Sequence, residues 1–348
     1  MLLGLLSICI LGGVVYCAFR KTWRAAGTYL LYEIKYNILG MLAIIHDLWN
    51  AKYNKIDLPS TPGKVAIVTG GSRGIGAIVV KKLLQCDMEV IIACRTIIAG
   101  EKTILQIRKS GVTNGQAKVY ELDNSSLESV REFAERIKKE YDKVHILINN
   151  AGVMFVPYHE TKDGFEEQWA VNYLSHFLLT SLLLPLLETG GRPDDCSRII
   201  NVTSCAYMLG DANFNDINCK GNLTQAVYAN SKLAQLIFTA TLQKLLMNRS
   251  LNIRIYSVHP GIVKTDLFNN SYVSKVKLLM IGFKTPEQGA IPIVYTAVNK
   301  DIEKKGVLYI SNCRENAVLP VVLDTKIQQQ LFNLSLKQAQ LNDFFQYL

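Results

Sequence analysis

The pattern of hydrophobic and polar positions becomes strictly rhythmic from Lys64 onward. Short apolar runs there alternate with longer segments of helical periodicity. The runs predict strands at Val65–Val68, Val90–Ala93, Ala117–Leu122, Val144–Ile148, Arg198–Val202, Ile253–Val258 and Val307–Ile310. The segments between them predict helices near Ile75–Gln85, Thr103–Lys109, Leu127–Lys139, Glu166–Leu187, Ala226–Met247 and Pro286–Val298. This alternation favours a doubly wound α/β fold, whose parallel sheet is covered on both faces. A ligand is then expected at the carboxyl ends of the strands.

The start of the chain lacks this rhythm. Residues 2–19 carry no charge, and Arg20, Lys21 and Arg24 follow directly. This length is at the lower limit for a helix that spans a bilayer. A cleaved signal peptide would need basic residues ahead of the apolar run, and none is present. We therefore interpret residues 1–25 as an uncleaved membrane anchor, and the positive flank predicts that the rest of the chain is cytosolic.

Residues 27–49 are apolar and aromatic but are interrupted by Glu33, Lys35 and Asp47. The pattern suits an interfacial or re-entrant helix better than a second membrane span, and a helix packed on the globular core is the alternative. A linker rich in proline and glycine ends at Gly63. The predicted organisation is an anchor (1–25), an interfacial helix with linker (26–62), one globular domain (63–315) and a C-terminal tail (316–348).

Charge and cysteine content narrow the function classes. The net charge is +9, but the basic residues are scattered, so an anionic cofactor or membrane is favoured and nucleic acid is not. The eight cysteines form no C-x-x-C pair, which indicates a reducing compartment and no metal site. Glycosylation sequons at Asn124 and Asn201 fall where a glycan would obstruct binding or folding, which also favours the cytosol.

A glycine-rich turn, Gly70-Gly71-Ser72-Arg73-Gly74-Ile75-Gly76, joins the first strand to the first helix. Such a turn lets the backbone approach a pyrophosphate at a helix N-terminus. The second strand ends at Arg95, and an arginine there suits the extra phosphate of NADP rather than the ribose hydroxyl of NAD. A solvated surface arginine is the alternative. The predicted cofactor residues in these two places are Gly70, Ser72, Arg73, Gly74, Ile75, Gly76 and Arg95.

Three further strand ends carry candidate cofactor contacts. Asp123 follows the third strand and can accept a hydrogen bond from adenine, and Asn150 stands beside small residues after the fourth. Thr265 follows the sixth strand and can meet the carboxamide of nicotinamide. His259 precedes a proline at that strand end, and we interpret its role as positional.

The candidate catalytic groups lie downstream. Tyr228 and Lys232 are four residues apart, so they share one face of a helix. A nearby ammonium lowers a phenol pKa, which would let Tyr228 exchange a proton with an alcohol or carbonyl near neutral pH. Lys232 would also reach the nicotinamide ribose. Ser204 ends the fifth strand, where its hydroxyl can stabilise developing charge, and Asn172 falls in the preceding helix.

These motifs, in this order, resemble the classical short-chain dehydrogenase/reductase family from about Lys64 to Ile310. The resemblance implies a single Rossmann-type domain, hydride transfer with NAD(P), and a catalytic tetrad of Asn172, Ser204, Tyr228 and Lys232. It also implies that the asparagine acts through its backbone and a water in a proton relay to the lysine. An intact tetrad argues against the alternative of a non-catalytic cofactor-binding scaffold.

Local stretches resemble two branches of that family. Ile92–Arg95, Asn150–Met154 and Asn172–Thr180 are similar to the membrane-bound retinol dehydrogenases. Asp163–Glu167, Phe283–Ala290 and Lys326–Phe332 are similar to the polyprenol dehydrogenases. The resemblance implies a lipid-soluble alcohol or aldehyde substrate, of isoprenoid type, with retinoids and sterols as alternatives. Arg95 departs from the second branch, which also uses NAD, so NADP is the expected cofactor and NAD remains possible.

The remaining expectations concern location and assembly. The segment Leu267–Phe283 is predicted to line an apolar substrate entrance, with a core-packed helix as the alternative. An anchored lipid enzyme is expected at the endoplasmic reticulum, or on a lipid droplet. The oligomeric state stays open, with a homodimer among the options.

Overall fold

The computed structural model describes residues 27, 30–214, 223–268, 282–306 and 308–348. The chain divides into two units, residues 1–42 and 43–348. The second unit contains an eight-stranded sheet of order β3-β2-β1-β4-β5-β6-β7-β8 within the described residues. Every neighbouring pair is parallel except β7 and β8. The strands are β1 (Val65–Thr69), β2 (Glu89–Cys94), β3 (Gln116–Glu121), β4 (Ile146–Asn149), β5 (Ser197–Val202), β6 (Ile253–His259), β7 (Tyr309–Ser311) and β8 (Arg314–Glu315).

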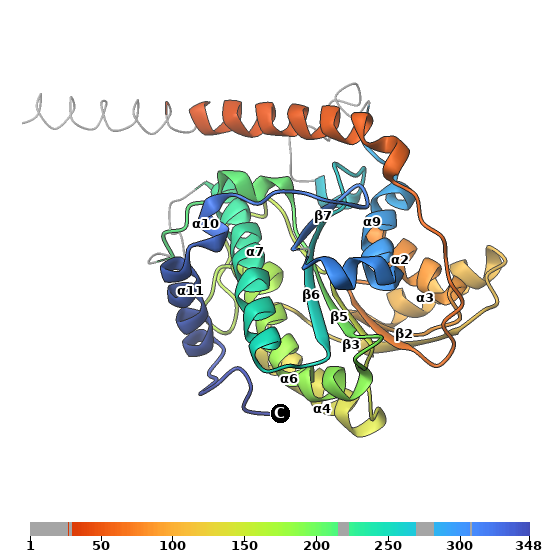
Figure 1. Ribbon diagram of the computed structural model, residues 1–348. Helices are drawn as coiled ribbons and strands as arrows, with labels where there is room; N and C mark the ends of the chain where they lie inside the picture. The colour runs from red at the N-terminus through yellow and green to blue at the C-terminus, as the bar shows by residue number, and fades with distance from the viewer. Residues whose placement is uncertain (1–26, 28–29, 215–222, 269–281, 307) are drawn as a thin grey trace, which may run out of the picture. The chain divides into compact units, whose positions relative to one another are not determined.

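Helices cover both faces of this sheet (Figure 1). One layer contains α2 (Gly74–Gln85), α3 (Ile97–Lys109) and α9 (Pro286–Val298), and the other contains α4 (Leu127–Glu140), α6 (Ser175–Gly190) and α7 (Thr224–Asn248). Because strand side chains alternate between faces, β1 supplies both cores. Ile67 belongs to the α4–α6–α7 core, and its neighbours Ala66 and Val68 belong to the α2–α9 core. The predicted doubly wound α/β fold is therefore confirmed.

The order of strands places a topological switch between β1 and β4. The chain leaves β1 for β2 and β3 on one side, then returns to β4 on the other. The loops after β1 and β4 consequently diverge at the carboxyl edge, which opens a crevice there. A ligand site at this edge is what the strand–helix alternation predicts.

The long apolar segment after β4 is a composite helix. It runs through α5 (Glu167–Trp169), a π-helical turn η2 (Ala170–Leu174) and then α6. Among the described residues, only this stretch is long and apolar enough to cross a membrane, and nearly all of it is buried inside the fold. Its hydrophobicity is therefore that of a core helix.

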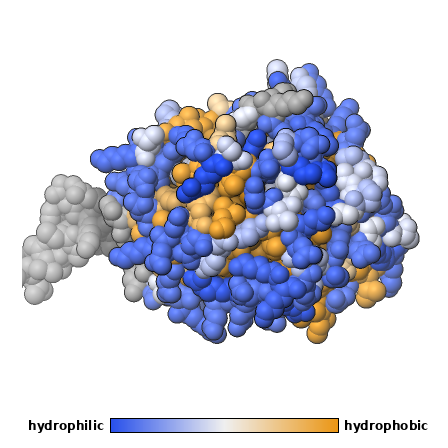
Figure 2. Space-filling view, turned by 60° about the horizontal axis from the view of Figure 1, so that its bottom comes forward, coloured by the Kyte–Doolittle hydropathy of each residue, from blue (hydrophilic) through white to orange (hydrophobic). Residues whose placement is uncertain are grey.

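The C-terminal segment after β8 is part of the folded domain. It forms α10 (Pro320–Leu323) and α11 (Thr325–Gln338), and both pack on α7 (Figure 1). Phe344, beyond α11, is fully buried among the rings of Phe177, Phe238 and Phe332. The remaining short helices are η1 (Ala51–Tyr53), η3 (Cys205–Leu209), η4 (Asp266–Phe268) and η6 (Lys300–Lys305). The face shown in Figure 2 is mainly hydrophilic, with hydrophobic residues visible between polar ones.

Residues 30–49 are helical. In the first unit, exposed apolar side chains recur at helical spacing at Leu30, Leu31, Ile34, Ile38, Met41 and Leu42. In the part that belongs to the second unit, Ile45, Leu48 and Trp49 are exposed, whereas Asp47 is buried. These last turns therefore combine an exposed apolar face with a polar contact to the globular core. The predicted anchor (1–25) lies outside the described residues, as does most of the predicted entrance segment.

The predicted strands and helices are all present within the described residues, and the differences lie at their ends and at one edge. α3 begins at Ile97, six residues before the predicted Thr103. β8 is a two-residue antiparallel strand that the apolar pattern does not mark. β3 is an edge strand, so most of its side chains are only partly covered.

Candidate active site

A cavity of about 330 Å³ opens at the carboxyl edge of the sheet. Its walls come from the loops after β1, β2, β3, β4 and β6. Most of the predicted cofactor residues line it, namely Gly70, Ser72, Arg73, Gly74, Ile75, Gly76, Arg95, Asp123, Asn150 and Thr265. Tyr228 and Lys232 are not among its lining residues.

The glycine-rich turn fits a pyrophosphate. α2 begins at Gly74, no side chain caps its N-terminus, and no acidic residue stands in its first turn. Its first N–H groups are therefore available to an anion, with the helix dipole in support. Gly76 is required for a different reason: a Cβ there would overlap the carbonyl oxygen of Gly70. The turn can hold this shape against α2 only without that side chain.

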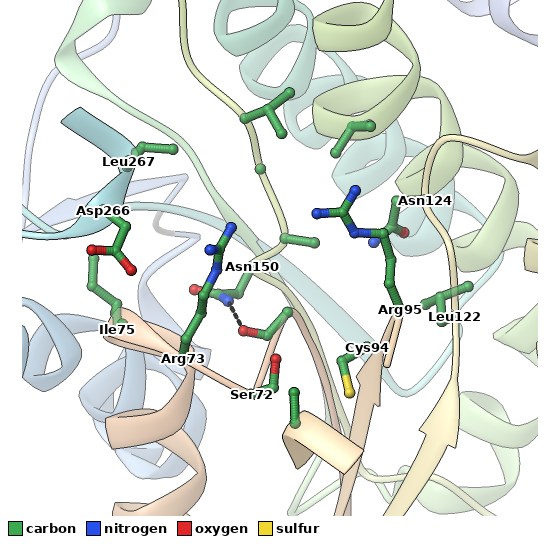
Figure 3. Close-up of a pocket in the computed structure, with 18 of the residues that line it drawn as sticks. Ser72, Arg73, Ile75, Cys94, Arg95, Leu122, Asn124, Asn150, Asp266 and Leu267 are labelled. Carbon is green, nitrogen blue, oxygen red and sulfur yellow. Dashed lines mark hydrogen bonds between the residues drawn. The ribbon is translucent and has the colours of Figure 1, made fainter. Parts of the chain in front are cut away.

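Two arginines supply positive charge to the same cavity. Arg73 extends from the glycine-rich turn and Arg95 from the end of β2, and both lie along the cavity in Figure 3. Both are exposed, and neither has an ion-pair partner among the described residues. Asn124 adds a buried side-chain oxygen that has no hydrogen-bond partner in the described structure. The cavity therefore fits a phosphorylated adenine dinucleotide. It offers the first N–H groups of α2, the guanidiniums of Arg73 and Arg95, and the side-chain oxygen of Asn124.

A buried polar network that the sequence analysis missed supports the cavity floor. The Thr69 hydroxyl at the end of β1 accepts hydrogen bonds from the backbone N–H groups of Asn150 and Ala151, each at 2.9 Å. It also lies 3.0 Å from Nε2 of His176 in α6. Burial lowers the pKa of His176 to about 3, so this imidazole is neutral. The loop after β4 is thus fixed to β1 by uncharged hydrogen bonds.

Tyr228 and Lys232 lie one turn apart on α7, as the spacing predicts. The Lys232 Nζ is 5.7 Å from the centre of the Tyr228 ring. It donates hydrogen bonds to the Val202 carbonyl oxygen at 3.0 Å and to Oε1 of Gln235 at 2.9 Å. Burial lowers the pKa of Lys232 to about 7.

The expectation that Lys232 lowers the pKa of Tyr228 is not met in this structure. Burial raises the pKa of Tyr228 above its ordinary value, and a hydrogen bond with Ser204 opposes that rise. The lysine is itself desolvated, so it offers the phenol little positive charge near neutral pH. Ser204 stands at the N-cap of η3, where its hydroxyl accepts a hydrogen bond from the Ala206 N–H at 3.2 Å.

Asn172 lies within the π-helical turn η2 and links the tetrad to the cavity. Its side chain accepts a hydrogen bond from the Val153 N–H at 2.8 Å and donates to the Val153 carbonyl oxygen and to Ser231 Oγ, each at 3.0 Å. A Cβ on Gly152 would stand 3.2 Å from the Asn172 Oδ1 and 3.8 Å from the Lys232 Nζ. Because Gly152 and Val153 both line the cavity, Asn172 and Lys232 lie directly behind its lining.

His259, at the end of β6, is buried, and neither ring nitrogen has a hydrogen-bond partner in the described structure. Burial lowers its pKa to about 4, so it is neutral at physiological pH. Asn201 in β5, the site of a predicted obstructed sequon, is also buried and donates to Thr239 Oγ1 at 2.9 Å.

Comparison with known proteins gives consistent results. A family model described as short chain dehydrogenase matches residues 64–275. A polyprenol dehydrogenase from Danio rerio is 37% identical over 320 residues, which are 90% of this chain and 98% of that protein. Retinol dehydrogenase 12 from Mus musculus is 39% identical, over 79% of this chain and 85% of that protein.

Solved structures agree on the fold. An uncharacterised protein from Mycobacterium paratuberculosis aligns with a TM-score of 0.66 at 29% identity, covering 82% of this chain and 96% of its own. The Pseudomonas aeruginosa RhlG/NADP active-site complex aligns with a TM-score of 0.57 at 25% identity, covering 73% of this chain and 96% of its own.

Proposed function

Because this chain belongs to the short-chain dehydrogenase family and is an NAD(P)-dependent oxidoreductase, we propose that it interconverts a long isoprenoid alcohol and its aldehyde. One observation carries the proposal. The similarity to the Danio rerio polyprenol dehydrogenase extends over 98% of that protein, well beyond the family domain. Retinoids are the second candidate substrate, because a retinol dehydrogenase has comparable identity.

The tetrad residues take complementary roles in this proposal. A nicotinamide bound in the cavity would supply or accept the hydride. Tyr228 transfers the proton of the reacting oxygen, and the Ser204 hydroxyl stabilises charge on that oxygen. Lys232, beside the tyrosine ring, can exchange a proton near neutral pH, because burial lowers its pKa to about 7. Asn172 fixes the loop at Val153 next to the reacting groups.

NADP is the proposed preferred cofactor, and the open guanidiniums of Arg73 and Arg95 support it. An arginine binds a 2′-phosphate by charge and bidentate hydrogen bonds, whereas NAD offers a neutral hydroxyl at that position.

We expect Arg95→Asp to weaken NADPH binding at least about 10-fold and to shift the preference toward NADH. Fluorescence titration with both cofactors measures the shift. Lys326→Asp makes the same change of charge on an exposed residue of α11, outside the cavity, and should leave the preference unchanged. An Arg95→Asp variant that prefers NADPH as the wild type does would remove Arg95 from the phosphate site.

A membrane location is also proposed, at the endoplasmic reticulum or a lipid droplet. It rests on the uncharged residues 2–19 and on the exposed apolar side chains at helical spacing in residues 30–42. A water-insoluble prenol partitions into the bilayer, so an enzyme held at the surface meets it at high local concentration.

Product formation by the detergent-purified full chain tests the function. Polyprenol, dolichal, retinol, retinal and a sterol are supplied in turn, each with NAD(H) and NADP(H), and mass spectrometry identifies the products. Turnover confined to long prenols or prenals supports the proposal. Turnover of retinoids alone would establish the second candidate and overturn the first.

A further inference from the structure

Outside the cavity, the described part of the chain contains a buried cluster of charged groups that the proposed chemistry does not use. Its centre is the carboxylate of Asp47, in the last turns of the helix 30–49. Asp47 Oδ1 forms an ion pair with the Lys284 Nζ at 3.0 Å and accepts a hydrogen bond from the Asn312 Nδ2 at 3.0 Å. Lys284 and Asn312 are themselves joined at 2.7 Å. The carboxylate is thus bound from two distant parts of the sequence.

The second oxygen of the carboxylate binds the loop that follows β6. The Ile262 backbone N–H donates to the Asp47 Oδ2 at 3.0 Å. Three residues later, Thr265 lines the cofactor cavity, together with Asp266 and Leu267. Its methyl group comes so close to the glycine-rich turn that a Cβ on Gly74 would lie 3.7 Å away. The amide that Asp47 holds therefore belongs to the loop that closes one side of the cavity.

Lys284 holds the same loop from its other side. Its backbone pairs with Ile262 and Lys264, and its side chain donates to the Pro260 carbonyl oxygen at 3.3 Å. Gly261 has a φ of +94°, and a Cβ there would lie 2.5 Å from the Asp47 Oδ2 and 2.6 Å from the Lys284 Nζ. The loop therefore fits closely over the ion pair, and only glycine allows that approach.

The charge state of the cluster is consistent with this role. Burial favours the neutral acid, but His259, Lys284 and the hydrogen bonds of Asn312 and Lys284 outweigh it and lower the pKa of Asp47. An ionised carboxylate makes a stronger hydrogen bond to a backbone N–H than a neutral group does.

We propose that Asp47 is a positioning residue for the cofactor site: by holding the Ile262 amide it fixes the loop 260–265 against the glycine-rich turn. The last turns of the helix, residues 43–49, then contribute to the dinucleotide site. This inference rests on the cofactor site proposed above.

Hydrogen exchange and cofactor affinity test the proposal on the purified full chain. In Asp47→Asn the amide oxygen replaces a charged acceptor, and the new N–H₂ group faces other donors. We expect about 10-fold faster exchange, without cofactor, in the peptide that contains Ile262, and about 10-fold weaker NADPH binding.

Asp195→Asn is the matched control. Asp195 is also buried and paired with a lysine, Lys64, at 2.8 Å, but it precedes β5 at the opposite edge of the sheet. The Asp195→Asn variant should keep the hydrogen exchange of the Ile262 peptide and the NADPH affinity of the wild type. Equal changes in Asp47→Asn and Asp195→Asn, or no change in Asp47→Asn, would overturn the proposal.

Two further variants guard against a folding failure. Gly261→Ala keeps both charges but forces the loop away from the carboxylate, and we expect the same two changes. If Asp47→Asn does not fold, Asp47→Asn/Lys284→Met, which buries no unpaired charge, takes its place. A wild-type protein that binds no NADPH would refute the proposed cofactor site. The difference in hydrogen exchange between Asp47→Asn and Asp195→Asn would still test whether Asp47 holds the Ile262 amide.

Discussion

Tyr228 is the residue on which the proposed chemistry depends most directly. It is buried, and the Lys232 Nζ lies 5.7 Å from the centre of its ring, so its hydroxyl is the proton donor that the proposal assigns to the reacting oxygen. We expect Tyr228→Phe to lower kcat by about 10²–10⁴-fold while leaving NADPH affinity within about twofold, because the ring remains and only the transferable proton is lost. Steady-state kinetics with the best prenol and a fluorescence titration measure both.

Tyr256→Phe is the control for that experiment. It removes a buried hydroxyl that has no hydrogen-bond partner in the described structure, so activity and stability should be retained. Normal turnover by Tyr228→Phe would show that the tetrad assignment is wrong.

Lys232 predicts a pH dependence of stability. Burial lowers its pKa to about 7 in the folded protein, whereas an unfolded chain has a lysine pKa of about 10.4. Between these values the unfolded chain binds more protons, so this residue makes the folded state more stable as the pH rises from about 7 to about 10. Lys232→Met lacks the effect.

The expected result is therefore that the Tm of Lys232→Met, relative to the wild type, falls steadily from pH 7 to pH 10. Thermal unfolding of the cofactor-free proteins at several pH values measures this difference. A constant difference would mean that Lys232 stays protonated in the fold throughout that range.

The functional residues that sequence reasoning missed have no local signature. Thr69 and His176 support the cavity through contacts between β1, β4 and α6, which exist only after the sheet has formed. Asp47 was treated as an interruption of an apolar helix, because its partners lie more than two hundred residues away in the chain. Glycines, strand ends and the Tyr228–Lys232 spacing could be predicted, since each depends on neighbours along the sequence.

At the level of elements, the hydrophobic periodicity predicts a helix or strand correctly wherever its apolar positions are the ones that pack into the core. α9 has the predicted bounds because Thr285 and Gln288 form a capping box directly before its apolar face. The π-helical turn at Asn172 could not be predicted, since it inserts a residue into an otherwise regular helix. β8 has two residues, too few to show any alternation.

The C-terminal elements give a stability prediction. Phe344 fills a buried site among the rings of α6, α7 and α11, and its carbonyl oxygen accepts a hydrogen bond from Ser181 at 2.6 Å. We expect Phe344→Ala to lower the free energy of unfolding by about 3–5 kcal/mol through lost burial and a cavity. Denaturant unfolding measures the change. Leu348→Ala, at the exposed chain end, should have little effect, and equal stability of the two variants would contradict this packing.

For the whole molecule, the proposed membrane location gives a prediction about topology. The positive flank at Arg20, Lys21 and Arg24 predicts a cytosolic domain. The fold contains an internal reporter of this topology: the sequon at Asn248, at the exposed end of α7, would accept a glycan in the lumen. The sequon at Asn201 cannot serve the same purpose, because its side chain is buried in β5 and would accept no glycan.

We therefore expect the full chain, expressed in mammalian cells, to remain in the membrane pellet after alkaline extraction and to show no mobility shift with endoglycosidase. An N-terminal extension with an acceptor sequon is the positive control, and the predicted orientation places it in the lumen, where it becomes glycosylated. The unextended chain could instead show a mobility shift that Asn248→Gln abolishes. That result would place the domain in the lumen. That outcome would expose the enzyme to the lumenal rather than the cytosolic cofactor pool, so the direction of its reaction would have to be reconsidered together with its topology.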